Sequence, residues 1–410
     1  MTDPQISILL GSGFSVPEGL PKISDINNKL SNLKKDDFYL FSDQSAGFYK
    51  TDYRDPNAWF SFLDRDFAER FTAFYISDVL NGVSSNFNYE VFYDYISDFL
   101  RFKKNNDKIS VFCESFRAGL ERQSYLDDDH NLIWRFNKIF NQLVADLLFV
   151  PNYHEDVSYF NYPHYDPFFS FLSENLATKV INVHTLNHDI FFDHMASKHS
   201  SLWQHFTDGF TEYGSPYYGE VSFDFKNLNN VIHKTYRVRL KFYNGEYKNR
   251  LRLYKLHGSI NYTKLLLTTS GDTIRVKRDY GVRDFVYETF NSDTKTYSYD
   301  HSFAENEPDY LTGTTEKIRQ YNNPFYENLF NHFRENLKNS SHLIVIGYGF
   351  QDGAINEYIE NNYLIFNKKI VIVDIKKPDT VFFEKYSDQI TFFDNGAIGL
   401  TYNEWMNVTE

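Results

Sequence analysis

Residues 6–21 of the chain read ISILLGSGFSVPEGLP, an apolar run that ends abruptly at Gly11 in the small residues GSG. The run predicts a buried strand, and glycine permits the positive φ and the close backbone approach that a tight turn or a bound ligand requires. The amides after the turn and the hydroxyl of Ser15 could face an anionic group. A phosphate-binding turn and a plain turn both stay open. The stretch is no P-loop, because Gly-Lys-Ser/Thr is absent, and Val16 stands where the GxGxxG fingerprint has its third glycine.

The composition predicts a globular chain of several units without a membrane span. A length of 410 residues gives a soft expectation of about two to three domains, and 42% hydrophobic residues suffice for a sizeable core. The mean hydropathy of -0.51 and the lack of a long uncharged apolar run argue against a transmembrane helix. The first strand begins almost at once and leaves no space for a signal peptide, so we expect a cytoplasmic protein.

The cysteine count and the charge exclude further classes. Because Cys113 is the single cysteine, the chain forms no intramolecular disulfide and offers no cysteine-based zinc site, and we expect no metal. The formal net charge is -13 and there is no long basic block, so we do not expect direct nucleic-acid binding. A local basic strip over residues 237–252 is interpreted as a solvated pair of strands, with a nucleic-acid contact as the alternative.

Residues 36–176 change to helical spacing. The pair Asp55 and Pro56 predicts a helix start, and apolar residues follow it at intervals of three and four. Similar stripes predict helices over residues 89–104 and 132–149. The region is longer than a single crossover helix requires, so we interpret it as a helical insertion between the first two strands of an α/β sheet.

Residues 179–189 read KVINVHTLNHD and predict a short buried strand followed by polar side chains. Thr185, Asn187 and Asp189 fall at the carboxyl end of this strand, where open parallel sheets bind their ligands. Asn187 and Asp189 lie two residues apart and would face one way in an extended segment, with His188 facing the other way. An Asx-rich turn that caps the next helix is the alternative interpretation.

A polar stretch rich in Tyr and Gly follows, and the pair Asn244 and Gly245 predicts a hairpin within it. His257 then ends an apolar strand immediately before Gly258. A histidine at an open sheet edge suits a general base with a pKa near neutrality, and a buried core histidine is the alternative. Residues 268–323 are rich in loops and receive no assignment.

Residues 342–350, HLIVIGYGF, repeat the arrangement of an apolar strand followed by glycines, here Gly347 and Gly349. Asp352 is predicted to cap the next helix. The strand KIVIVD then ends in Asp374, and an acid in this position commonly accepts hydrogen bonds from ribose hydroxyls. A last strand is predicted close to residues 390–394.

The segments GSGFSVPEGLP, TLNHD, LHGS, GYGFQD and IVIVD, in this order, resemble the sirtuin-like (silent-information-regulator-type) family. In particular, they resemble the zinc-less branch of NAD-cleaving effectors in bacterial anti-phage defence. Three features depart from protein deacylases or from the branch itself. Lys22 and Ser24 stand where a deacylase carries Asp and Arg, the four cysteines of the zinc ribbon are absent, and Gln351 replaces a common glycine.

The resemblance implies an α/β fold whose core is a Rossmann-like parallel sheet of sirtuin type, with two insertions. The expected core comprises residues 1–35, 177–194, 253–262 and 340–402. The expected insertions are a helical cap over residues 36–176 and a β-rich or loop-rich part over residues 195–252 and 263–339.

The resemblance also implies the roles of the site residues. Asn187 would orient the ribose or the attacking water, His257 would act as the base, and Asp189 would hold the nicotinamide side or the Asn187 loop. The groups expected to bind NAD+ are Gly11, Ser12, Gly13, Ser15, Thr185, Gly347, Gly349 and Asp374. The first glycine turn and Ser15 would cradle the pyrophosphate, and Asp374 would bind the adenosine ribose.

The implied function is an NAD+ hydrolase that releases nicotinamide and ADP-ribose and depletes NAD+ as a triggered abortive-infection effector. Because such an enzyme needs control, we expect a separately encoded activating or regulatory protein partner and a homo- or hetero-oligomer, with contacts through an insertion. The alternatives are a non-catalytic module that binds NAD or ADP-ribose, and an NAD-dependent protein deacylase or ADP-ribosyl transferase.

Overall fold

The structure is a computed structural model of the chain. It describes residues 3–40, 46–48, 61–80, 86–104, 106–120, 128–149, 163–227, 230–278, 282, 284–301 and 303–409.

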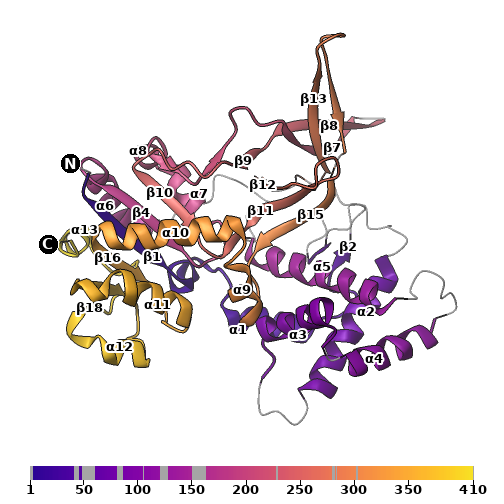
Figure 1. Cartoon of the computed structure of the whole chain (residues 1–410), viewed down its shortest axis with the longest axis horizontal. Coiled ribbons are helices and arrows are strands. Elements are labelled where there is room, and N and C mark those ends of the chain that lie inside the picture. Colours follow the sequence, from indigo (N-terminus) through magenta and orange to yellow (C-terminus); the bar gives the residue numbers. More distant parts are fainter. Residues whose placement is uncertain are drawn as a thin grey trace.

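A seven-stranded sheet forms the centre of the molecule, in the order β18-β17-β16-β1-β4-β10-β5 (Figure 1). Every neighbouring pair in it is parallel. The strands are β1 (Gln5–Leu10), β4 (Val180–Thr185), β5 (Phe206–Thr207), β10 (Leu251–Lys255), β16 (Ser340–Ile346), β17 (Ile370–Val373) and β18 (Ile390–Phe393). The predicted α/β fold class with a parallel core is therefore confirmed.

The first strand lies inside this sheet, and the strand order reverses there. The chain adds β4 and β10 on one side of β1, and β16, β17 and β18 on the other side. Crevices at such a switch point, beyond the carboxyl ends of the strands, are where open α/β sheets bind ligands. The sheet therefore supplies a candidate binding region before any side chain is considered.

Both faces of the sheet are covered by helices, as a parallel sheet requires. Alternate residues of β1 point to opposite faces, so Ile6 and Ile8 join one buried cluster and Leu9 joins another. The first cluster contains α6 (Asp166–Leu176), α7 (Phe191–Lys198) and α13 (Tyr402–Asn407). The second contains α10 (Pro324–Asn339), α11 (Gly353–Asn362) and α12 (Val381–Lys385).

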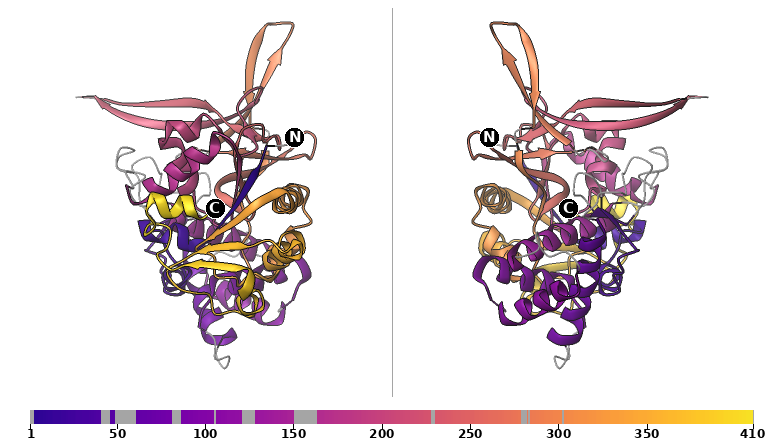
Figure 2. Two further views of the ribbon diagram at one scale, coloured as in Figure 1. Left: turned by 90° about the vertical axis from the view of Figure 1, so that its left-hand side faces the viewer. Right: turned by 90° about the vertical axis from the view of Figure 1, so that its right-hand side faces the viewer.

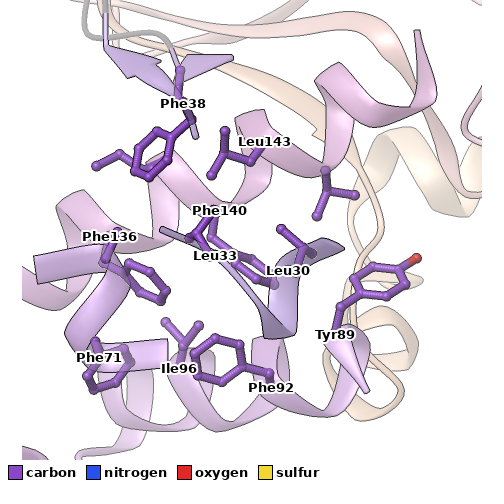
Figure 3. Packing of buried hydrophobic residues seen from close by; sticks show 14 of the residues in the cluster. Leu30, Leu33, Phe38, Phe71, Tyr89, Phe92, Ile96, Phe136, Phe140 and Leu143 are labelled. Atoms are coloured by element: carbon purple, nitrogen blue, oxygen red, sulfur yellow. The ribbon is translucent and has the colours of Figure 1, made fainter. Parts of the chain in front are cut away.

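The helical region packs around its own aromatic core (Figure 3). It contains α1 (Ile23–Ser31), α2 (Ser61–Phe74), α3 (Tyr89–Phe102), α4 (Asn106–Ala118) and α5 (Asp129–Leu148), with the short strands β2 (Tyr39–Leu40) and β3 (Ala46–Gly47). Phe71, Phe92 and Phe136 are buried together, with ring centroids 5.0–5.9 Å apart. The three predicted helices are present as α2, α3 and α5, whereas Asp55 and Pro56 lie outside the described residues.

Two antiparallel sheets follow, and the long hairpins that project from the body belong to the four-stranded one (Figure 2). One sheet contains β6 (Phe210–Thr211), β9 (Lys241–Tyr243), β11 (Gly258–Leu267), β12 (Thr273–Lys277) and β15 (Phe303–Tyr310). The other contains β7 (Tyr217–Asn227), β8 (Asn230–Arg239), β13 (Asp284–Asn291) and β14 (Thr296–Asp300). The described residues also include the short helices α8 (Ser200–Trp203) and α9 (Thr315–Gln320).

The prediction of a hairpin at Asn244 and Gly245 is wrong. The strand before this pair, β9, bonds to β12 and β6, whereas the strand after it, β10, enters the central sheet. Gly245 does adopt a positive φ of 72°, so the turn exists, but the two strands part after it. Residues 268–323, which the sequence left unassigned, contain β12, β13, β14, β15 and α9. Among the described helices, none is long and apolar enough to cross a bilayer.

Candidate active site

A cavity of about 570 Å³ opens at the carboxyl ends of the central strands. Leu10 is level with Ile346 on one side and with Thr185 on the other, and Thr185 is level with Lys255. The loops that follow β1, β4, β10 and β16 therefore start at the same height and meet. The predicted site residues that line the cavity are Gly11, Ser12, Ser15, Asn187, Asp189, His257, Gly347 and Gly349.

The two glycine turns bind one another. The N–H of Gly11 donates to the carbonyl of Ile346 at 2.9 Å, and the N–H of Gly13 donates to the carbonyl of Gly347 at 2.9 Å. A Cβ atom on Gly11 would lie 2.5 Å from the oxygen of Gly347. We expected backbone and hydroxyl donors of the first turn to cradle a pyrophosphate, but the amides of Gly11 and Gly13 are used in these contacts, and Gly11 has a φ of -109° without the positive value that glycine permits. The absence of side chains here lets two strand ends touch.

Replacing Gly347 with alanine should destabilise the fold strongly. Gly347 has a φ of 62°, and a Cβ there would lie 2.5 Å from the Cα of Gly13. Left-handed backbone and a forced shift of a buried turn together should lower the free energy of unfolding by about 2–4 kcal/mol. Urea unfolding measures this, with Gly353→Ala as the matched control, because nothing lies within 4 Å of a Cβ there. Equal stability of the two variants would contradict the account of the turns.

Asn187 is held with a fixed orientation. Its Nδ2 donates to the carbonyl of Gly11 at 2.9 Å and to the hydroxyl of Ser15 at 3.3 Å. A backbone carbonyl only accepts, so the group facing Gly11 must be the amide nitrogen. The N–H of Asn187 donates to Oγ1 of Thr185 at 3.0 Å. Thr185 is buried and does not line the cavity, so it supports the loop from outside the lining. The side-chain oxygen of Asn187 is the polar atom that these contacts leave for a ligand.

Asp189 fixes the position of Ser15, which in turn contacts the side chain of Asn187. The hydroxyl of Ser15 donates to Oδ2 of Asp189 at 2.9 Å, and the N–H of Phe191 donates to Oδ1 at 2.9 Å. Burial raises the pKa of the Asp189 carboxyl above its usual value. Because the Ser15 proton goes to Asp189, Ser15 is not the phosphate donor that we expected. Because Oδ1 of Asp189 accepts from the N–H two residues later, where α7 begins, the alternative interpretation of an Asx turn also fits this residue.

His257 lines the same cavity and is almost fully buried. Its Nε2 is 3.1 Å from the hydroxyl of Tyr321 and 3.7 Å from Oδ2 of Asp352. Burial and the charges of Lys317 and His188 hold the pKa of His257 well below its usual value, contrary to the expectation of near-neutrality. The imidazole is therefore neutral at neutral pH.

His188 also lines the cavity, although we expected it to face away from Asn187 and Asp189. The segment after β4 is not an extended strand, so its side chains do not alternate. The ring of His188 lies 6.2 Å from that of His257 and 5.1 Å from that of Tyr310, measured between centroids. Burial, followed by the charges of Lys317 and Lys255, lowers the pKa of His188 to about 3.

Three charged residues of the cavity were not predicted from the sequence as site residues, although one of them, Asp352, was predicted as a helix cap. Lys317 comes from α9, Glu90 comes from α3, and Asp352 precedes α11. Asp352 caps α11 as predicted, with Oδ1 accepting from the N–H groups of Ala354 and Ile355, while its Oδ2 lies 3.2 Å from Nζ of Lys317. Burial raises the pKa of Glu90. No local motif marks Lys317 or Glu90, but an acid three residues after Gly349 could have marked Asp352 as a cavity residue.

A buried ionic network supports the Asp189 loop from the side of the β-rich part. Nζ of Lys255 contacts the carbonyl of Asp189, lies 3.1 Å from Asp193 and donates to Ser259 at 2.8 Å. Lys277 of β12 lies 2.5 Å from the same Asp193. Burial would raise the pKa of Asp193, but the two lysines outweigh it and lower the pKa to about 2. Strand β12 is thereby tied to the loop that positions Asn187.

The two remaining predicted residues lie apart from the cavity lining. Gly13 packs against Gly347. Asp374 is the first residue after β17, and its Oδ1 accepts from the N–H of Ile375 at 2.7 Å. The ribose role of Asp374 stays a prediction. Within the described residues, no group of three His, Cys, Asp or Glu side chains is placed to hold a metal ion.

A family model described as a SIR2-like domain matches residues 225–378. The matched segment contains His257, Gly347, Asp352 and Asp374, and it does not include the first glycine turn or Asn187. It covers less than half of the chain. The motif resemblance is therefore supported for this segment, whereas the zinc-less branch and the role in anti-phage defence stay proposals.

Other comparisons add little. No curated protein matches the chain. Three solved structures align with 99% of it: one from work on sirtuin substrate affinity (11% identity, 94% of that chain, TM-score 0.37), one of a SIR2 homologue with NAD (8%, 90%, 0.36), and one from work on the mechanism and regulation of Sir2 enzymes (11%, 93%, 0.34). Similarities of this size support no inference about function.

Proposed function

We propose that the chain hydrolyses NAD+ at the bond between nicotinamide and ribose. The observation that carries this proposal is that Asn187, His257 and both glycine turns share one cavity at the switch point of a parallel sheet. Such crevices bind nucleotides in open α/β folds. The match of residues 225–378 to a SIR2-like domain supports a function related to NAD.

The proposed reaction begins with loss of the neutral leaving group. The bond between ribose C1 and the ring nitrogen breaks, and its electron pair goes to the nitrogen, which becomes uncharged in nicotinamide. Positive charge then develops on the ribose carbon. The side-chain oxygen of Asn187 carries partial negative charge and is held by the contacts to Gly11 and Ser15. A dipole fixed in advance stabilises such charge without reorganisation.

Water then completes the reaction. Its oxygen bonds to the ribose carbon, and its proton passes to Nε2 of His257, giving ADP-ribose. The depressed pKa keeps this imidazole neutral and able to accept a proton at physiological pH. Asp352, with Oδ2 at 3.7 Å from Nε2, would stabilise the imidazolium that forms.

We propose that only part of the expected set of residues contacts the phosphates. The amides of Gly11 and Gly13 are occupied by the second glycine turn, and the Ser15 hydroxyl by Asp189. Ser12 and Gly349 also line the cavity and are the proposed contacts for the pyrophosphate. Asp374 remains the proposed partner of the adenosine ribose.

The finer assignment is a triggered effector that depletes NAD+ in anti-phage defence, belonging to the zinc-less, sirtuin-like branch. The motif order and the single cysteine support it. An unregulated enzyme of this kind would harm its own cell, so we propose a separately encoded activator and an oligomer as the means of control.

Release of nicotinamide from NAD+ tests the proposal. The purified chain is incubated with NAD+, alone and with copurifying proteins, and nicotinamide and ADP-ribose are quantified by chromatography. The proposal predicts equimolar release of both products. Binding of ADP-ribose without nicotinamide release under every condition would favour a binding module. Release that requires an acylated peptide would favour a deacylase.

A further inference from the structure

The base nitrogen of His257 is occupied by a residue outside the central sheet. The hydroxyl of Tyr321, at the end of α9, lies 3.1 Å from Nε2, and the two rings lie nearly parallel at an angle of 18°. We take Nε2 to carry the lone pair, which is the tautomer that the role of a base requires.

Tyr321 is therefore the donor in its contact with His257. Burial, followed by the negative charge of Asp352, raises the pKa of Tyr321 far above its usual value, so the phenol keeps its proton. An O–H group that donates to Nε2 fills the position where a water molecule or a ribose hydroxyl would have to donate. In this conformation the base is in place but not available.

Helix α9 brings a second group to the same place. Nζ of Lys317 lies 3.2 Å from Oδ2 of Asp352, the carboxylate closest to Nε2. The charged or titratable groups facing His257 are thus Lys317 and Tyr321 from α9, Asp352 before α11, and His188 after β4. While Lys317 neutralises Asp352, this carboxylate is less able to stabilise a protonated His257.

The helical region fixes α9 in this position. Asp94 of α3 accepts from the N–H of Thr314 at 3.0 Å and from its hydroxyl at 2.6 Å. One turn further, Asp98 accepts from Arg319 at 3.0 Å. Gly313 has a φ of 94° directly beside Asp94, so the chain enters α9 in close contact with α3. Figure 1 shows α9 between α10 of the core and α3.

We propose that Tyr321 blocks the base nitrogen of His257, that α3 holds it there, and that the chain acts on NAD+ only when α9 shifts. A shift would remove Tyr321 from Nε2 and Lys317 from Asp352 together. The freed carboxylate would then support proton uptake by His257. The inference rests on the proposed function for its consequence, but the blocking contact itself can be tested without NAD+.

Diethyl pyrocarbonate, which modifies the free nitrogen of neutral imidazole, measures the contact directly. The rate of modification of the peptide containing His257 is followed by mass spectrometry in the full-length chain. Losing one hydrogen bond at Nε2 should raise this rate about tenfold in Tyr321→Phe. Asp94→Asn weakens the contact between α3 and α9 at a residue outside the cavity lining. This variant should also raise the rate at which His257 is modified.

Tyr358→Phe is the matched control. Tyr358 packs on Phe330 beside Tyr321, with 5.2 Å between the centroids of Tyr358 and Phe330, and it does not line the cavity. The rate at which His257 is modified in Tyr358→Phe should equal the rate in the wild type. Equal rates in Tyr321→Phe and Tyr358→Phe would overturn the blocking contact, whether or not the chain cleaves NAD+.

Turnover supplies the second measurement. Tyr321→Phe should raise kcat for nicotinamide release about tenfold with a smaller change in KM, because the contact acts on the base and not on binding. Faster modification of His257 without NAD+ cleavage in any variant would leave the blocking contact intact and refute the proposed function. A lower kcat in Tyr321→Phe than in the wild type would show that Tyr321 assists His257 and would overturn the inference.

Discussion

Asn187→Ala is expected to lose NAD+ cleavage by about 10²–10³-fold, the usual effect of removing one preorganised group that stabilises developing charge. The side-chain oxygen is the only part of Asn187 that its contacts to Gly11 and Ser15 leave for the ribose carbon. The loss should appear in kcat for nicotinamide release, since the oxygen acts mainly when positive charge develops.

Asn182→Ala provides the control for this variant. Asn182 is a buried asparagine of the same strand, β4, and its Nδ2 donates to Gln5 at 3.0 Å, away from the cavity lining. It should lower stability and leave kcat unchanged. An Asn187→Ala enzyme that retains at least half of the wild-type kcat would remove Asn187 from the mechanism.

His257→Gln is expected to lower kcat by about 10²–10⁴-fold, the range that a positioned general base contributes. The matched control is His332→Gln on α10, because His332 packs against Tyr254 and does not line the cavity. Loss of activity in both variants, or in neither, would contradict the role of His257 as the base.

The pH dependence gives an independent check on the same residue. Burial holds the pKa of His257 well below the usual 6.5, so the imidazole is already neutral at pH 6.5. The profile of kcat/KM, which reports the free enzyme, should therefore be flat from about pH 6 to 8 and fall only in more acidic solution. A rise centred near pH 6.5 would show an exposed histidine and would contradict the buried geometry.

The sequence predicted well what depends on local pattern and on strand ends. Asn187 and Asp189 follow the apolar strand β4, His257 follows the apolar strand β10 much later in the chain, and parallel strands end at one edge of the sheet. The buried stripes of α3 and α5 likewise follow from spacing alone. These features need no knowledge of the partners that each element contacts.

The roles of the glycines and of Ser15 could not be predicted, because they depend on what the turn meets in space. The sequence shows that Gly13 and Gly347 can approach a ligand, but only the fold shows that they approach each other. Ser15 offers one proton, and the buried carboxylate of Asp189 takes it.

Lys317 and Tyr321 were missed for a related reason. Lys317 lies on a helix of only six residues and Tyr321 directly follows it, in a stretch without clear periodicity. Their importance comes from contacts to Asp352 and His257. The hairpin expected at Asn244 failed because two successive strands join different sheets. Local pattern specifies a turn, whereas long-range packing specifies where the chain goes next.

A crystal structure of the chain with ADP-ribose tests the central claim most directly. The account predicts that the ligand occupies the cavity of about 570 Å³, with C1 of its terminal ribose between the side-chain oxygen of Asn187 and Nε2 of His257. Ser12 and Gly349 should contact the pyrophosphate. ADP-ribose bound at another surface, or with its terminal ribose away from both side chains, would contradict the account.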